Sequence, residues 1–225
     1  MTYTGATVPR LGGMEQGSKP RSVKIGEDER LGWSSERPRR EGGPARPADI
    51  STRNRVLKPS EEILYSPGSL LVIVSSAPED AEAFVSRLVQ NKGAIMSITK
   101  VRGLLQGRVA EEELEDRAAE LLTNAVAKRI ESSETVVYLA QTLSPEEREP
   151  HVRAAATAGR PRHLMLFEPA GVNLDDEQKA TLSDLRRRLT AGEMGEEGFQ
   201  TSLRLAGSSI GEVKRLDFQR PARDD

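Results

Sequence analysis

Two short segments of the chain place polar side chains directly after predicted strands. In parallel α/β sheets, ligands bind at this edge, beyond the carboxyl ends of the strands. The second of these segments follows the apolar run 94–98 and contains Ser97 and Arg102. A guanidinium group can bind a phosphate through two parallel hydrogen bonds, so Arg102 is a candidate phosphate ligand. The first segment follows the apolar run 69–75 and consists of Ser75, Ser76, Ala77, Pro78, Glu79 and Asp80.

The first segment lacks the residues that a phosphate-binding loop needs. Such a loop uses glycines that turn backbone N–H groups toward the phosphates, a lysine that neutralises them, and a serine or threonine that binds Mg²⁺. After Val74 the chain has no glycine or lysine before Lys92 and Gly93, and acidic residues stand where the cation is needed. Like charges close to a triphosphate are unfavourable. We interpret the segment as a degenerate phosphate-binding loop that serves as a strand–turn–helix scaffold.

The apolar pattern alternates between strand and helix four times, which predicts an α/β fold with a parallel sheet and helices on both faces. The segment 101–107 is predicted to be irregular, and Pro150 is predicted to kink or divide its helix. The predicted strands are 69–75, 94–98, 135–140 and 163–167, followed by short strands at 202–205 and 213–218. The predicted helices are 78–92, 111–131, 144–158 and 175–191.

The first part of the chain, residues 1–62, has no sustained apolar periodicity and is rich in Gly, Pro, Arg and Ser. Such a segment cannot bury enough apolar surface to offset its chain entropy, so we predict a disordered tail. An α/β domain is predicted at 63–219 and a C-terminal tail at 220–225. Four arginines of the first tail could contact phosphates or an acidic partner, although acidic residues between them favour a solvated tail: Arg37, Arg39, Arg40 and Arg46.

The composition argues against several classes of site and partner. The chain of 225 residues has no cysteine, which excludes disulfides and thiolate metal sites, and its two histidines stand far apart. A net charge of −2 gives no overall attraction to nucleic acid or to anionic lipid. The apolar runs are too short to span a bilayer. We therefore expect a soluble cytoplasmic protein with no metal, no cofactor and no membrane association.

Taken in chain order, the motifs resemble the P-loop kinases of the polynucleotide 5′-kinase type, which include the kinase module of bacterial RNA-repair enzymes. In that family the second strand ends in a Ser-x-Asp-x-x-Arg motif, which Ser97 and Arg102 match here. The resemblance implies that Ser97, Arg102 and Arg148 bind a phosphate or the substrate. It covers roughly Leu70 to Phe218 in element order, and its further supports are Gly103, Ala127–Arg129, Thr135–Val137, Glu146–Arg148 and Glu197–Phe199.

The chain departs from this family at the positions that carry its chemistry. Thr99 stands where the family has the Asp that activates the substrate hydroxyl, and threonine is no general base near neutral pH. The third strand runs into Gln141-Thr142 rather than Asp-Ala-Thr-Asn, and the segment 168–173 lacks the arginines of the family's lid. Phosphoryl transfer depends almost wholly on positioning and charge stabilisation, so these combined losses should abolish it. We expect no catalytic residue.

Three functions are compatible with this sequence. The first, which we favour, is a catalytically degenerate kinase-like module that binds a protein partner or regulates one. The second is an active nucleotide-dependent kinase, or another phosphate-handling enzyme, with an atypical site that uses Arg102 and Glu168. The third is a nucleic-acid-binding module that uses Arg102 and the basic tail, with weak and strongly salt-dependent binding.

Overall fold

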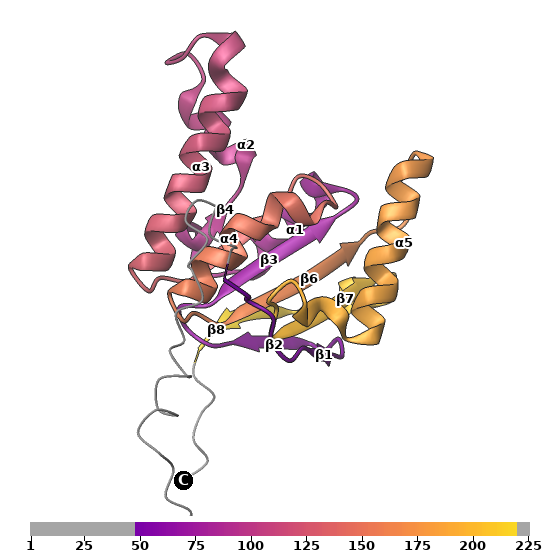
Figure 1. Ribbon diagram of the computed structural model, residues 1–225. Coiled ribbons are helices and arrows are strands. Elements are labelled where there is room, and N and C mark those ends of the chain that lie inside the picture. Colours follow the sequence, from indigo (N-terminus) through magenta and orange to yellow (C-terminus); the bar gives the residue numbers. More distant parts are fainter. Residues whose placement is uncertain (1–47, 220–225) are drawn as a thin grey trace, which may run out of the picture. The chain divides into compact units, whose positions relative to one another are not determined.

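The computed structural model describes residues 48–219 and confirms the predicted α/β fold (Figure 1). Six parallel strands form one sheet in the order β1-β7-β6-β3-β5-β4. Their bounds are β1 Arg55–Leu57, β3 Leu70–Ser75, β4 Ile95–Met96, β5 Val136–Leu139, β6 Arg162–Glu168 and β7 Thr201–Ala206. A second, two-stranded parallel sheet pairs β2 Glu62–Tyr65 with β8 Arg215–Phe218.

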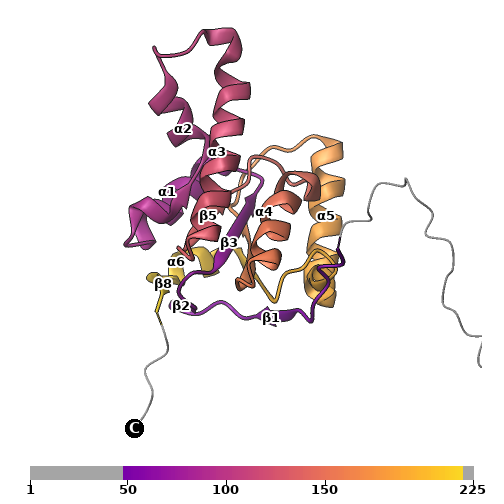
Figure 2. The ribbon, with the colours of Figure 1, turned by 60° about the vertical axis from the view of Figure 1, so that its left-hand side comes forward.

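The helices lie between these strands in sequence, as the alternating pattern predicts. The outer part of the α2–α3 hairpin extends beyond the sheet (Figure 1 and Figure 2), while the inner part of α3 packs on the sheet with α4. The helix bounds are α1 Pro78–Leu88, α2 Ile98–Leu105, α3 Leu114–Glu131, α4 Pro145–Thr157, α5 Asp176–Ala191 and α6 Ser208–Glu212. Three single-turn 3₁₀ helices are η2 Lys92–Ala94, η3 Glu111–Glu113 and η4 Glu193–Gly195.

Two hydrophobic cores cover the two faces of the sheet. Alternate residues of β3 divide between them, since Leu70, Val72 and Val74 pack on the side of α3, α4 and α5, while Leu71 and Ile73 pack on the side of α1 and β8. Every residue of β3 is buried. The central strand therefore has no solvent-facing side, which explains why its sequence is a continuous apolar run rather than an alternating one.

The domain begins earlier than predicted, because residues 48–62 belong to the folded unit. β1 pairs with the outer edge of β7, and the Thr52 N–H donates to the Gly195 carbonyl at 2.9 Å. The Asn54 amide donates to the Phe199 carbonyl at 3.1 Å and accepts from the Ser202 hydroxyl at 2.9 Å. The predicted boundary at residue 63 is therefore wrong. The apolar pattern does not reveal β1 because a strand of three residues, held mainly by polar contacts, has no apolar period. The predicted disorder of residues 1–47 lies outside the described residues, as does the tail 220–225.

The structure also corrects two local predictions. The segment 101–107 is not irregular, because α2 occupies Ile98–Leu105 and shortens the preceding strand to Ile95–Met96. The Ser97 hydroxyl caps α2 by accepting from the Lys100 N–H at 3.3 Å. The helix α4 continues through Pro150 without division. Pro150 is exposed near the first turns of α4, where water can satisfy the carbonyl that lacks its usual N–H donor.

Gly195 tests whether the first strand is held as described. A Cβ atom at Gly195 would lie 2.0 Å from the Thr52 carbonyl oxygen and 3.1 Å from the Asn54 nitrogen, both of which are backbone atoms that cannot rotate away. We expect Gly195→Ala to lower the free energy of unfolding by about 1–3 kcal/mol, measured by urea denaturation. Gly103→Ala is the matched control, because no atom lies within 4 Å of the added Cβ. Equal stabilities for the two variants would contradict this packing.

Candidate binding cleft at the carboxyl edge of the sheet

The chain reverses its direction of winding at β3, and a cleft opens there. The connection after β3 leads toward β4 and β5 on one side, while the connection after β5 crosses to β6 on the other. Such a switch point leaves a crevice beyond the carboxyl ends of the strands. The cleft has a volume of about 390 Å³. Its lining comprises Ser75, Ser76, Pro78, Gln141, Thr142, Leu143, Ser144, Leu174, Asp175, Glu177, Gln178 and Thr181.

The degenerate loop forms one wall of this cleft and is closed by its own hydrogen bonds. The Ser75 hydroxyl accepts from the Ala77 N–H at 2.9 Å and donates to the Ala77 carbonyl at 3.1 Å. Helix α1 begins at Pro78, which has no N–H, and Glu79 and Asp80 occupy its exposed first turn. The acidic first turn complements the helix dipole, so this end of α1 offers little to an anion. The structure thus places Ser75, Ser76 and Pro78 at the cleft, with Glu79 and Asp80 next to it.

Glu147 accepts hydrogen bonds from the backbone N–H groups that follow β5. Its carboxylate accepts from the backbone N–H groups of Gln141 and Thr142, each at 2.7 Å, and from the Thr142 hydroxyl at 2.6 Å. The Tyr138 hydroxyl donates to the same carboxylate at 2.9 Å, and burial together with this negative charge raises the pKa of Tyr138. Two adjacent backbone N–H groups form the kind of concavity that binds anions. Here a side chain of the protein itself fills it.

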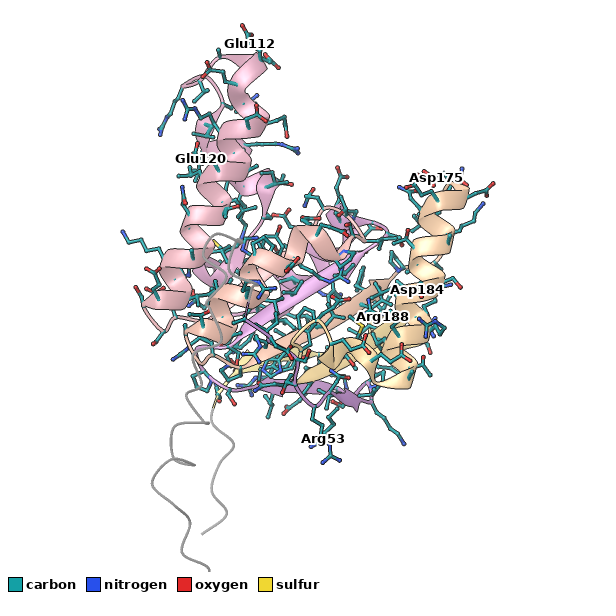
Figure 3. The ribbon with its side chains drawn as sticks, in the orientation of Figure 1. Arg53, Glu112, Glu120, Asp175, Asp184 and Arg188 are labelled. Atoms are coloured by element: carbon teal, nitrogen blue, oxygen red, sulfur yellow. The ribbon has the colours of Figure 1, made fainter. Side chains whose placement is uncertain are left out.

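Helix α5 closes the opposite wall with a complete capping box. The Asp175 carboxylate accepts from the Gln178 N–H at 2.7 Å, and the Gln178 side chain accepts from the Asp175 N–H at 3.2 Å. Figure 3 shows Asp175 at the free tip of α5. The third helix that begins at the cleft, α4, is capped by the Ser144 hydroxyl, which accepts from the Glu146 N–H at 3.3 Å. One N–H group in the first turn of α4 and one in the first turn of α5 are therefore capped by side chains of the protein.

The charge of the cleft follows from its lining. No lysine, arginine or glycine is among the twelve residues around it, and its two charged side chains, Asp175 and Glu177, are acidic. The rest of the polar lining consists of serine and threonine hydroxyls and the amides of Gln141 and Gln178. This arrangement can hydrogen-bond a neutral or cationic ligand. It supplies no countercharge to a polyphosphate.

The predicted ligand residues Ser97 and Arg102 do not line this cleft, and both bind side chains of the protein. Ser97 is fully buried, and its hydroxyl donates to the Glu82 carboxylate of α1 at 2.8 Å. Arg102 on α2 forms an ion pair with Glu115 on α3, in a half-exposed position. Ser97 thereby links α1 to the start of α2, and Arg102 links the two helices of the projecting hairpin. Their assignment as phosphate ligands stays a prediction.

Arg148, the third predicted ligand residue, is held in a buried ion pair and is not among the residues that line the cleft. Its side chain is 2% exposed, and its Nε and Nη2 atoms donate to the two Glu197 oxygens at 2.7 and 3.0 Å. Its Nη1 atom donates to the Leu143 carbonyl at 2.9 Å. Arg188 of α5 donates to the same Glu197 carboxylate at 2.5 Å. Figure 3 shows Arg188 on α5, well below the tip that carries Asp175. Glu197 thus links Arg148 on α4 to Arg188 on α5.

Comparisons with known proteins assign the chain to no family. No model of a protein family matches the chain, and no similar sequence is found among curated proteins. Within residues 48–219, no helix is long and apolar enough to cross a membrane. The same part of the chain holds no group of three or more histidine, aspartate or glutamate side chains that could bind a metal ion. The resemblance to polynucleotide 5′-kinases therefore rests on the sequence motifs alone.

The sequence pattern missed the residues that define the cleft on its acidic side. Glu147 is the third helical residue after the cap Ser144, which is the position of a capping-box glutamate. Its carboxylate turns instead to the loop after β5, and only the fold brings that loop within reach. From the sequence, Asp175 and Glu177 show only the acidic start that is typical of a helix, because such residues complement its dipole. Both belong to the cleft because α5 begins directly opposite the end of β3.

Proposed function

We propose that this protein is a binding or regulatory module with a degenerate P-loop kinase-like domain that does not transfer phosphoryl groups. One observation carries the proposal: the charged residues in and beside the cleft are acids, and several N–H groups at its edge are already bound by the chain. The acids are Asp175 and Glu177 in the lining and Glu79 and Asp80 beside it, and the bound N–H groups are those taken by Glu147, Ser144 and Asp175.

Phosphoryl transfer requires stabilisation of the negative charge on the transferred group. Active enzymes of this kind neutralise the transferred group with lysine, arginine and Mg²⁺. The cleft contributes carboxylates in their place, and Arg148, one of the predicted ligand residues, is ion-paired with Glu197. A ligand bound here would contact hydroxyl and amide groups near the starts of α1, α4 and α5. Recognition of a neutral or cationic group, on a small molecule or on a partner protein, fits this lining.

An assay of phosphoryl transfer tests the proposal. With ATP, Mg²⁺ and an oligonucleotide carrying a 5′-hydroxyl, we expect no transfer above the rate without protein. Thr99→Asp restores the residue type that the resemblance assigns to the general base, and we expect this variant to stay inactive because the cations are still missing. Transfer by the unchanged protein that depends on protein concentration and Mg²⁺ would overturn the proposal.

A further inference from the structure

A second polar cluster lies at the ends of β6 and β7, on the same face of the sheet as α5 and outside the cleft lining. Its centre is Glu168, the last residue of β6, whose side chain is only 5% exposed. The Arg186 Nε of α5 donates to one Glu168 oxygen and the Arg204 Nε of β7 donates to the other. Both guanidinium groups are therefore held at the same carboxylate, one at each oxygen.

The outer edges of both guanidinium groups are open. The side chains of Arg186 and Arg204 are 44% and 43% exposed, and only the Nε atom of each is hydrogen-bonded. Within residues 48–219, the Nη atoms of both arginines have no hydrogen-bond partner. Two half-exposed guanidinium groups, held by one buried carboxylate, thus keep their Nη donors available to a ligand.

The charge of the cluster is unbalanced. One carboxylate and two guanidinium groups carry a net charge of +1 near neutral pH, since arginine is always protonated in proteins. The register of β1 on β7 ends with Leu57 opposite Leu203, so Lys58 is the residue next in line with Arg204. Lys58 is exposed. The cluster is therefore a cationic site on a domain whose main cleft is acidic.

We propose that Arg186 and Arg204, held by Glu168, form a binding site for a tetrahedral oxyanion, either inorganic phosphate or the phosphate of a monoester. Paired guanidinium forks match the oxygens of a phosphate in geometry and charge. The buried carboxylate fixes both arginines before the ligand arrives, so less side-chain entropy is lost on binding. The site does not depend on the proposed function of the cleft.

The alternative role of this cluster is purely structural, as an ion-pair link between α5 and the sheet. That role uses the Nε atoms alone and would be served almost as well by lysine. Phosphate binding uses the forked Nη atoms, which lysine lacks. Arginine-to-lysine variants therefore separate the two roles while keeping the positive charge.

Calorimetric titration at low ionic strength, with inorganic phosphate and with phenyl phosphate as separate probes, tests the site. We expect saturable binding of at least one probe, weakened roughly tenfold or more by Arg186→Lys and by Arg204→Lys, the loss expected for a charge-assisted hydrogen bond. Arg187→Ala is the matched control, because Arg187 is an exposed neighbour on the same helix that pairs with Asp184 and Glu193. We expect it to bind like the unchanged protein. Thermal denaturation of each variant verifies that it folds.

The possible outcomes decide between a site and a surface charge. Binding of only one probe supports the proposal and identifies whether the free ion or a monoester is the ligand. No saturable binding of either probe overturns it. Binding that survives both lysine substitutions, or that falls equally with Arg187→Ala, also overturns it, because non-specific attraction would then be sufficient.

Discussion

Replacing Glu197 with alanine is expected to lower the free energy of unfolding by about 3–5 kcal/mol. The variant removes the carboxylate that binds Arg148, whose side chain is 2% exposed. Among residues 48–219, the buried guanidinium then keeps only the Leu143 carbonyl as a partner. It also removes the contact of Arg188 with α4 through Glu197. Urea denaturation followed by circular dichroism measures this loss.

The neighbouring residue provides the matched control. Glu196 is 73% exposed, and its ion pair with Arg188 spans 3.7 Å, so Glu196→Ala should cost less than about 1 kcal/mol. Arg148→Met should also cost less than Glu197→Ala, because Glu197 keeps its contact with Arg188. Similar losses for Glu196→Ala and Glu197→Ala would show that the buried pair does not hold α4 and α5 together.

Acidification is expected to destabilise the fold through two buried histidines. Burial lowers the pKa of His151 and of His163 to about 4 from an ordinary value near 6.5. As the pH falls, the histidines of the unfolded chain are protonated before those of the folded chain. The two neutral, buried histidines therefore contribute their full stabilisation above pH 6.5, and this contribution is lost as the pH falls toward 4. The loss is of the order of 3 kcal/mol per histidine. Urea denaturation at a series of pH values measures it.

The surroundings of the histidines define suitable variants. His163 lies between two hydroxyls, with Nδ1 at 2.8 Å from Thr201 Oγ1 and Nε2 at 3.3 Å from Ser69 Oγ, so His163→Gln keeps both hydrogen bonds possible. His151 packs against the Tyr138 ring at a centroid distance of 4.2 Å, which His151→Phe preserves. The double variant should lose much less stability between pH 6.5 and 4 than the unchanged protein. An identical pH dependence would contradict this account.

The order of the longer strands and helices could be predicted because each of them has its own apolar pattern. The continuous run of β3 and the stripes of α3 and α5 depend only on neighbours along the chain. The strand β1 could not be predicted in this way. Three residues provide no period, and their stability comes from backbone contacts with β7 and from the close approach at Gly195, which are distant in sequence.

The candidate site was only partly predictable for the same reason. The sequence directs attention to the end of β3, and Ser75, Ser76 and Pro78 line the cleft there. The ion-pair partners of Arg148 and Glu168 are 18 to 49 residues away along the chain, in the next helix or in β7 and its preceding loop. No local pattern distinguishes an arginine that faces a buried glutamate from one that faces solvent.

We infer that the cleft at the carboxyl edge of the sheet does not bind a nucleoside triphosphate, because its lining provides acids and no cation. Calorimetric titration with ATP and Mg²⁺ tests it most directly, with Asp80→Ala as the companion variant because Asp80 contributes to the acidic first turn of α1. We predict no saturable binding at micromolar concentrations for either protein. Saturable micromolar binding of ATP and Mg²⁺ by the unchanged protein, retained in Asp80→Ala, would contradict the claim.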